Sequence, residues 1–229
     1  MNELRVYQLG QLDYATSLTR QVEFVDQRGP NTPDEIWCLQ HNPVYTLGLA
    51  GKAEHILNQN YIPVYQTDRG GQVTYHGPGQ LVVYLLLDLK RKAVSVKKYV
   101  HSLEQALIDM LEGLDIFAER NAGAPGVYVN GEKIAALGIR IRRGCCYHGI
   151  SLNVNMDLSP FAGINPCGYP GMVVTQLANH GKHIDVNEAA LALIPFMAKE
   201  LGYENYTWLE KTQLTDHKNN LKPEALLTR

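Results

Sequence analysis

Cysteines and long apolar runs are scarce in this sequence, which argues against a disulfide-stabilised protein and against a membrane-spanning one. The four cysteines among 229 residues, two of them adjacent at Cys145 and Cys146, are too few and too irregularly spaced for a disulfide framework. The longest clean apolar run, Leu81–Leu87, is far shorter than the roughly 18 to 20 residues that cross a bilayer. Met1–Tyr14 lacks the basic, apolar and small-residue regions of a secretory signal. We therefore expect a cytoplasmic protein with reduced thiols and no membrane partner.

Charge of either sign is also in little excess. The chain has 21 Lys+Arg and 23 Asp+Glu, and 21 − 23 gives a net charge of −2, which argues against nucleic acid as a partner. With 45% hydrophobic and 19% charged residues, the composition is typical of a folded globular protein. No repeat, low-complexity tract or linker divides the chain. We expect one catalytic domain over residues 1–210 and a polar tail over 211–229.

The glycine motifs that bind phosphates are missing. Gly51-Lys52 and Gly181-Lys182 both lack the preceding glycine and the following hydroxyl residue of a P-loop. Gly77-Pro78-Gly79 has Val82 where the third glycine of a dinucleotide-binding turn belongs. ATP bound through a P-loop and NAD bound through a Rossmann turn are therefore both disfavoured.

Hydrophobic spacing predicts three helices: one over 13–26 capped by Asp13, one from Ser95 to about residue 114, and one opening at Asp185 with Glu188 in the capping-box position. We expect Pro195 to kink the last helix. Strands are expected over 36–40, 44–47, 63–67, 72–75, 81–89, 127–129, 133–142 and 145–156, with turns at Asn130-Gly131 and Arg143-Gly144. Strands and helices do not alternate regularly, so the predicted class is α/β (α+β), a single domain with a mixed β-sheet flanked by helices.

Cys167 is the first candidate for chemistry. It lies in the loop 165–171, where two prolines and two glycines fix the backbone and let a ligand approach closely. The alternative is an incidental loop thiol, because a functional cysteine needs an activating partner. Lys133 is the candidate partner, since in an unbulged strand it shares a face with Ala135 and Leu137, where burial would favour a neutral, proton-accepting amine. The alternative is that Lys133, two residues past a turn, extends into solvent.

The segment Arg69–Gln80 is the most unusual stretch of the chain. Its paired glycines, flanked by Arg69 and followed by Tyr75 and His76, suggest a backbone that lies directly against a ligand. The alternative is a glycine bulge in which His76 makes an ordinary structural hydrogen bond. His148 shares strand parity with apolar residues and is expected to be a core histidine. A metal site at Cys145, Cys146 and His148 lacks a second ligand pair with zinc spacing.

Taken together, five ordered motifs resemble the octanoyl-(acyl-carrier-protein):protein N-octanoyltransferase family, also called lipoate-protein ligase B. They are RGGQVTYHGPGQ (69–80), GAPGVY (123–128), GEKIAALG (131–138), HGISLN (148–153) and PCG (166–168), and the resemblance covers about residues 6–203. The resemblance implies a biotinyl/lipoyl protein ligase-like fold and a catalytic dyad of Cys167 and Lys133. It implies acyl-binding positions at Arg69, Gly70, Gly71, Gln72, Val73, Thr74, Tyr75, His76, Ala136, Leu137, Gly138, Gly149, Ile150 and Ser151.

The resemblance also implies the reaction. An octanoyl group would move from acyl carrier protein to Cys167, and then to a lysine of the lipoyl domains of 2-oxoacid dehydrogenases or of the glycine cleavage H protein, without cofactor or metal. Two alternatives stay open: an ATP-dependent lipoate or biotin ligase, which would not need Cys167, and a noncatalytic acyl-binding protein. Because the family's partners are acidic, two basic runs are candidate docking sites, with solvated faces as the alternative. They are Lys90, Arg91, Lys92, Lys97 and Lys98, and, on the strand that carries Lys133, Arg140, Arg142 and Arg143.

Overall fold

Three helices form where their caps and apolar stripes predict them. In the computed structural model, which describes residues 3–209, α1 (Tyr14–Gln27), α2 (Val96–Glu112) and α3 (Val186–Glu200) follow the side-chain caps Asp13, Ser95 and Asp185. Glu188 completes the predicted capping box. Pro195 lies inside α3, which continues to Glu200, and a kink there stays a prediction. The predicted tail, 211–229, lies outside the described residues.

The strands form one large mixed sheet and one small sheet. The large sheet has the order β11-β1-β2-β6-β10-β9-β8-β7, in which β1 is parallel to β2 and to β11 and the other neighbours are antiparallel. Its strands are β1 (Leu4–Leu12), β2 (Asp34–His41), β6 (Gln80–Leu86), β7 (Glu119–Arg120), β8 (Val127–Val129), β9 (Glu132–Arg142), β10 (Cys145–Asn153) and β11 (Thr207–Leu209). The small sheet, β4-β3-β5, comprises β3 (Val44–Leu47), β4 (Val64–Gln66) and β5 (Val73–His76). The predicted mixed sheet is confirmed.

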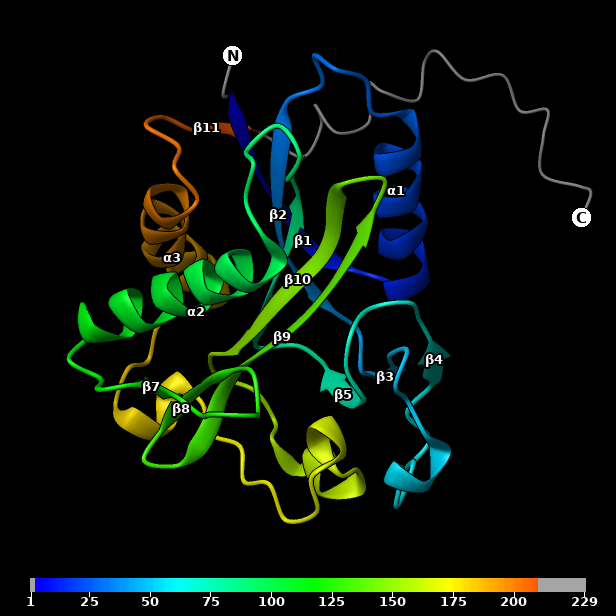
Figure 1. Cartoon of the computed structure of the whole chain (residues 1–229). Coiled ribbons are helices and arrows are strands. Elements are labelled where there is room, and N and C mark those ends of the chain that lie inside the picture. The colour runs from blue at the N-terminus through cyan, green and yellow to red at the C-terminus, as the bar shows by residue number, and fades with distance from the viewer. Residues whose placement is uncertain (1–2, 210–229) are drawn as a thin grey trace, which may run out of the picture.

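Helices cover both faces of the large sheet (Figure 1). On one face α2 and α3 pack over the largest apolar cluster, which includes buried residues of β6, β9 and β10. On the other face α1 packs over a smaller cluster that contains Trp37, Tyr84 and Tyr147. The small sheet packs with the short helix η2 (Ser159–Gly163) around Tyr45 and Phe161. No helix in residues 3–209 has the length and apolar character required to cross a membrane.

The predicted strands are confirmed with small shifts of their ends, but β1, β7 and β11 were not predicted. β6 is buried along its whole length, as its apolar run indicates. The turn at Asn130-Gly131 joins β8 to β9 with φ values of 51° and 82°, which matches a type I′ hairpin. Arg143 and Gly144, with φ values of 54° and 88°, join β9 to β10 in the same way.

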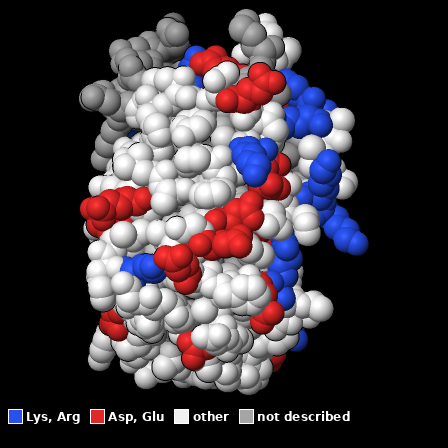
Figure 2. All heavy atoms as spheres, turned by 90° about the vertical axis from the view of Figure 1, so that its left-hand side faces the viewer, with Lys and Arg blue, Asp and Glu red and all other residues white. Residues whose placement is uncertain are grey.

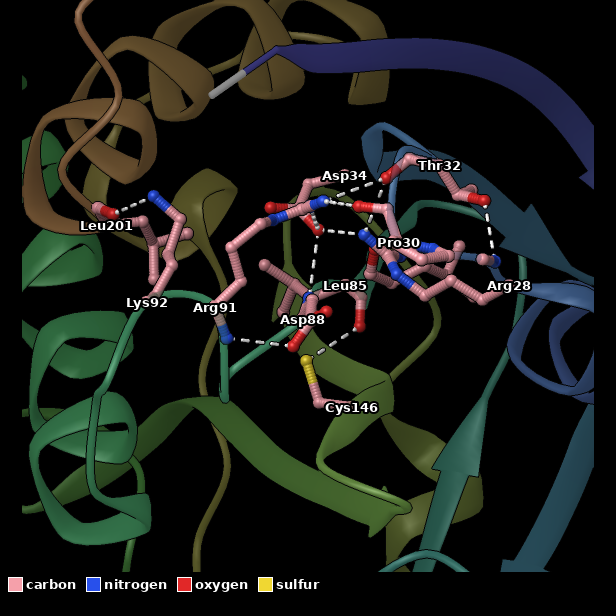
Figure 3. Close-up of polar contacts among 12 residues, drawn as sticks. Arg28, Pro30, Thr32, Asp34, Leu85, Asp88, Arg91, Lys92, Cys146 and Leu201 are labelled. Carbon is pink, nitrogen blue, oxygen red and sulfur yellow. Dashed lines mark hydrogen bonds and ion pairs between the residues drawn. The ribbon is translucent and has the colours of Figure 1, made fainter. Parts of the chain in front are cut away.

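A buried ion cluster ties the start of β2 to three other segments (Figure 3). Asp34 is fully buried and accepts from the guanidinium groups of Arg28, after α1, and of Arg91, in the loop between β6 and α2. It also accepts from the hydroxyl of Tyr203 at 2.5 Å and from the backbone N–H of Asp88 at 2.9 Å. One carboxylate therefore connects α1, β2, the β6–α2 loop and the chain after α3.

Candidate functional site

The structure brings Cys167 and Lys133 together. The Nζ atom of Lys133 donates to the Sγ atom of Cys167 at 3.1 Å and to the carbonyl oxygen of Pro125 at 3.2 Å. It also lies 5.2 Å from the centre of the Tyr128 ring. Lys133 is only 4% exposed, so the alternative in which it extends into solvent is wrong. A thiol in contact with a buried amine has the partner that a functional cysteine requires.

The face of Lys133 is set by a bulge that the sequence did not reveal. Val127 of β8 pairs with Ala135, whereas Tyr128 pairs with Lys133, so Ile134 is an extra residue on β9. Ile134 and Ala135 both join the large apolar cluster under α2 and α3. The prediction of an unbulged strand, with Lys133 on the same face as Ala135, is therefore wrong.

The protonation state of Lys133 also differs from the prediction. Burial alone would lower the pKa of this amine. The facing charge of Cys167 and the hydrogen bond to the Tyr128 hydroxyl together raise it by more than burial lowers it, so the net pKa is raised. The neutral amine predicted from burial alone is thus not the favoured form. Beside the sulfur, Lys133 holds its proton as an ammonium.

Backbone pairing holds the lysine close to the cysteine loop. The N–H of Lys133 donates to the carbonyl of Val173, and its carbonyl accepts from the N–H of Thr175, both at 3.0 Å. Cys167 itself lies in the short helix η3 (Pro166–Gly168) with φ of 57° and ψ of 14°, in the left-handed region that a cysteine rarely adopts. Lys133 and Cys167, which are 34 positions apart in the sequence, are therefore the two ends of a closed loop.

Most of the predicted acyl-binding positions line one cavity together with Cys167. The empty space inside it, including its open mouth, is about 500 Å³. Of the predicted residues, Arg69, Gly71, Gln72, Val73, Thr74, His76, Ala136, Leu137, Gly138, Gly149, Ile150 and Ser151 line it. Gly70 and Tyr75 do not: the Gly70 N–H donates to the carbonyl of Ile139 at 3.0 Å, and Tyr75 packs against Tyr45 and Phe161.

Four lining residues were missing from the predicted set: Tyr14, Val82, Tyr84 and His148. Tyr14 begins α1 and lies far from the motifs in sequence, so only the tertiary fold brings it to the cavity. His148 was expected on an apolar face with Ile150. Its φ of 58° breaks the alternation of the strand, and its ring lies beside Tyr147 and Tyr84 instead.

Behind the lining residues Tyr84 and His76 lies a network of hydrogen-bonded aromatic and imidazole rings. The ring nitrogens of His41 contact the Tyr84 hydroxyl at 2.6 Å and the Leu12 carbonyl at 2.8 Å. His76 contacts the Gln80 side chain at 2.7 Å, as the structural alternative for this histidine expects. Burial lowers the pKa of His41 to about 4 and that of His76 to about 3, so both rings are neutral near pH 7.

His148 has a charged partner at the edge of the cavity. Its Nε2 atom lies 2.9 Å from an Asp68 carboxylate oxygen, and the Tyr147 hydroxyl donates to the other oxygen. The bond from His148 is the largest cause that lowers the pKa of Asp68 to about 2. The alternative metal site at Cys145, Cys146 and His148 is therefore not formed, because the Cys146 thiol instead contacts the Tyr99 hydroxyl and donates to the Leu85 carbonyl.

Arg69 is a structural element of the cavity wall. Its guanidinium donates to the carbonyl oxygens of Thr46, Gly70 and Gln72 at 2.6 to 2.8 Å, and to the Thr46 hydroxyl. Its aliphatic stem packs against Gly138, where a Cβ atom would lie 3.0 Å from the Arg69 Cδ atom. The paired glycines after Arg69 thus let a backbone loop pack against β9, and contact of this backbone with a ligand stays a prediction.

The two basic runs lie next to each other but not beside Lys133. Lys90 packs over Gly144, next to Arg143, and Figure 2 shows Lys and Arg gathered at one edge of the face formed by α2 and α3. Arg142 and Arg143 pair with Asp26 of α1 at 3.3 and 3.8 Å. Arg142 is nine residues from Lys133 along β9, or about 30 Å at roughly 3.3 Å per residue. Arg142 and Arg143 therefore do not lie close to the dyad, whereas Arg140, the third residue of this run, lies 3.9 Å from Asp68, the partner of the cavity-lining His148.

Comparison with known proteins places the whole site within one family. The profile of the lipoyl protein ligase A/B catalytic domain matches residues 13–198. An octanoyltransferase of Chromobacterium violaceum is 54% identical over 199 residues, which cover 87% of this chain and 96% of that protein. An octanoyltransferase of Xanthomonas euvesicatoria pv. vesicatoria is 56% identical over 194 residues, covering 85% and 84% of the two chains.

Solved structures share the fold at low sequence identity. A crystal structure of lipoate-protein ligase A bound with ATP superposes with a TM-score of 0.77 at 15% identity, covering 94% of this chain and 93% of that one. A biotin protein ligase from Aquifex aeolicus reaches 0.51 at 15% identity, covering 88% and 70%. These similarities confirm the predicted fold.

Proposed function

This chain belongs to the octanoyltransferases of the lipoyl protein ligase A/B catalytic-domain family, and from that premise we propose how its residues act. The chain transfers an octanoyl group from acyl carrier protein to Cys167, and from Cys167 to the acceptor lysine of a lipoyl domain. The acceptors are the lipoyl domains of 2-oxoacid dehydrogenases and the glycine cleavage H protein. The reaction takes place in the cytoplasm, whose reducing conditions suit the four free cysteines.

The observation that carries the proposal is the contact of 3.1 Å between Lys133 Nζ and the Sγ atom of Cys167, which lines an apolar-walled cavity. The ammonium stabilises a thiolate, which is the nucleophilic form of cysteine. Of the other three cysteines, Cys38 and Cys146 are buried, and burial raises the pKa of the Cys146 thiol to about 12. Burial also raises the pKa of the half-buried Cys145. Cys167 is therefore the favoured nucleophile.

The proton moves between three groups through the two half-reactions. The Cys167 thiolate attacks the carrier thioester, the bond from the carbonyl carbon to the carrier sulfur breaks, and the leaving thiolate takes the proton of the Lys133 ammonium. The acceptor amine then attacks the new thioester on Cys167 and passes a proton to the neutral Lys133 amine. The bond to Sγ breaks, and the original ion pair is restored. No ATP is consumed, because the donor is already a thioester.

The negative charge on the carbonyl oxygen requires hydrogen-bond donors, and β9 supplies a candidate. The Ile139 carbonyl faces the loop that contains Gly70, where it accepts a bond of 3.0 Å. Backbone groups two residues apart on a strand point in the same direction, so the N–H of Leu137 points to the same edge of β9 as the Ile139 carbonyl. The pairing of β8 with β9 ends at Ala135, so β8 does not pair with Leu137. Leu137 lines the cavity with Cys167, which suits its N–H to an oxyanion.

The walls of the cavity fit an alkyl chain. Val73, Val82, Leu137 and Ile150 give it an apolar lining, and each buried CH₂ contributes roughly 0.8 kcal/mol to binding. Gly71 and Gly138 also line the cavity and place no side chain in it. The polar rings of Tyr84 and His148 also line this cavity.

The principal alternative is an ATP-dependent ligase on the same fold, since a lipoate-protein ligase A structure superposes closely. At 15% identity that similarity concerns the fold alone, whereas the octanoyltransferase relatives are 54 to 56% identical. A ligase would also leave the Cys167–Lys133 contact without a role. Transfer from octanoate plus ATP, with no activity from octanoyl-carrier protein, would favour the ligase.

Intact-mass spectrometry after incubation with octanoyl-carrier protein tests the proposal. We expect one hydroxylamine-labile octanoyl adduct on the wild-type protein and on Cys145→Ser, and none on Cys167→Ser. Addition of a lipoyl domain should discharge the adduct and acylate the domain. An adduct that persists on another cysteine of Cys167→Ser would contradict the assignment, and octanoyl binding without an adduct on the wild type would favour a noncatalytic acyl-binding protein.

A further inference from the structure

We infer that Glu104, on the core-facing side of α2, is a positioning residue that acts on Lys133 through the peptide group between Pro125 and Gly126. The inference rests on the proposed dyad of Cys167 and Lys133. Glu104 touches neither reacting group directly. It belongs to α2, whereas Lys133 belongs to β9, and it was not among the predicted site residues.

Glu104 is a buried carboxylate with two defined partners. It is 7% exposed, and its Oε1 atom accepts from the backbone N–H of Gly126 at 2.9 Å. Its Oε2 atom accepts from Arg120 Nε at 3.2 Å, and Arg120 in turn donates to the His101 carbonyl and to Gln105. Burying a carboxylate costs free energy unless hydrogen bonds compensate it. Glu104 is therefore an unusual residue for the apolar side of α2, and its bond to the Gly126 N–H is one of the contacts that compensate its burial.

The same peptide group joins Glu104 to Lys133. The N–H of Gly126 and the carbonyl of Pro125 are the two ends of one planar trans peptide, so they point in opposite directions. The N–H end meets Glu104 at 2.9 Å, and the carbonyl end accepts from Lys133 Nζ at 3.2 Å. The two hydrogen bonds therefore fix both ends of the same peptide group, and each bond polarises the other.

Gly126 makes this arrangement sterically possible. Its φ is 144°, and a Cβ atom there would lie 2.8 Å from the Ala135 carbonyl oxygen and 3.0 Å from Lys133 Cε. Only a residue without a side chain lets the backbone approach the lysine stem so closely. With Glu104 fixing one end of this peptide, the carbonyl at the other end holds Nζ at the distance that reaches Cys167.

The test measures how the alkylation of Cys167 by iodoacetamide depends on pH, by mass spectrometry of the peptide that contains it. Glu104→Ala removes the acceptor for the Gly126 N–H, whereas the amide oxygen of Glu104→Gln retains it. Glu112→Ala is the matched control, since Glu112 is an exposed residue of the same helix. Lys133→Met defines the profile without the ammonium, and thermal unfolding verifies that each variant is folded.

We expect Glu104→Ala to shift the alkylation midpoint upward, toward that of Lys133→Met, and to reduce the rate near neutral pH roughly threefold or more, equivalent to about half a pH unit. Glu104→Gln and Glu112→Ala should keep the wild-type profile. A wild-type profile for folded Glu104→Ala would overturn the inference, and so would a Glu104→Gln profile equal to that of Glu104→Ala, which would assign the effect to charge. If Lys133→Met itself leaves the profile unchanged, it is the proposed dyad that fails.

Discussion

Asp34→Asn removes the one negative charge between Arg28 and Arg91 and changes the size of the side chain very little. Asp34 is fully buried, and the side chains of Arg28 and Arg91 are 2% and 25% exposed. The amide oxygen of asparagine can still accept one of the bonds from Tyr203 or from the Asp88 N–H. It cannot neutralise the Arg28 guanidinium, which stays enclosed by protein.

The expected decrease in the free energy of unfolding follows from that enclosed charge. Breaking a buried ion pair by removing one partner costs about 3 to 5 kcal/mol, because the other charge is left without compensation. For a chain of this size, 1 kcal/mol corresponds to about 2 to 4 °C in Tm, so the variant should melt about 6 to 20 °C lower. None of Arg28, Asp34, Arg91 and Tyr203 lines the cavity at Cys167, so kcat per folded molecule should be unchanged.

Urea unfolding of Asp34→Asn beside Asp26→Asn measures the difference. Asp26 also pairs with two arginines, Arg142 and Arg143, but its side chain is 37% exposed, and exposed pairs contribute only about 0.2 to 1 kcal/mol. A loss below about 1 kcal/mol for Asp34→Asn, or a loss equal to that of Asp26→Asn, would refute the claim that this cluster stabilises the fold through its buried charge.

Three further outcomes are expected. Lys133→Arg should lower kcat nearly as much as Lys133→Ala, because a guanidinium cannot give its proton to the leaving thiolate; an arginine variant that retains most of its turnover would reduce the role of Lys133 to electrostatics. The free energy of unfolding should decrease as pH falls from about 6.5 toward about 3, since the unfolded chain takes up protons that His41 and His76, with pKa values of about 4 and about 3, exclude when folded. Replacing both histidines with glutamine should flatten the urea midpoints over this range, and an unchanged slope would exclude them as its source. Arg142→Glu with Arg143→Glu should leave kcat/KM for octanoyl-carrier protein within about twofold, because the pair lies about 30 Å along β9 from Lys133; a larger, salt-dependent loss would restore a docking role.

Local signals in the sequence predicted most of the helices and strands of the fold. Asp13, Ser95 and Asp185 cap their helices by hydrogen bonds within one turn, and Asn130-Gly131 fixes a hairpin through the φ values of two residues. β1 escaped prediction because it depends on partners elsewhere in the chain. Its register shifts between Gln8 and Gly10, and this irregularity blurs the alternation that marks a strand.

The site was predictable in its residues but not in its geometry. The motifs identified Cys167 and Lys133, yet the face of the lysine depends on an extra residue at Ile134 that appears only when β8 pairs with β9. Parity placed Lys133 on the wrong face and left solvent exposure open, and its charge state depends on the sulfur that it faces. Tyr14 reaches the cavity from another helix, and no local pattern carries that information.

The pairing of Lys133 with Val173 and Thr175 has a consequence for the life of the newly made chain. The amine and the sulfur are 34 positions apart in the sequence and meet only after the chain between them has closed into a loop. Such loops close late in folding, because the chain loses entropy on closure before it gains the contacts. A chain still emerging from synthesis, or one partly unfolded by heat, holds Cys167 as an ordinary thiol beside no amine. The nucleophile is therefore activated only when the sheet is complete. Misfolded copies should react slowly with acyl donors, so they should not accumulate acyl groups that they cannot transfer.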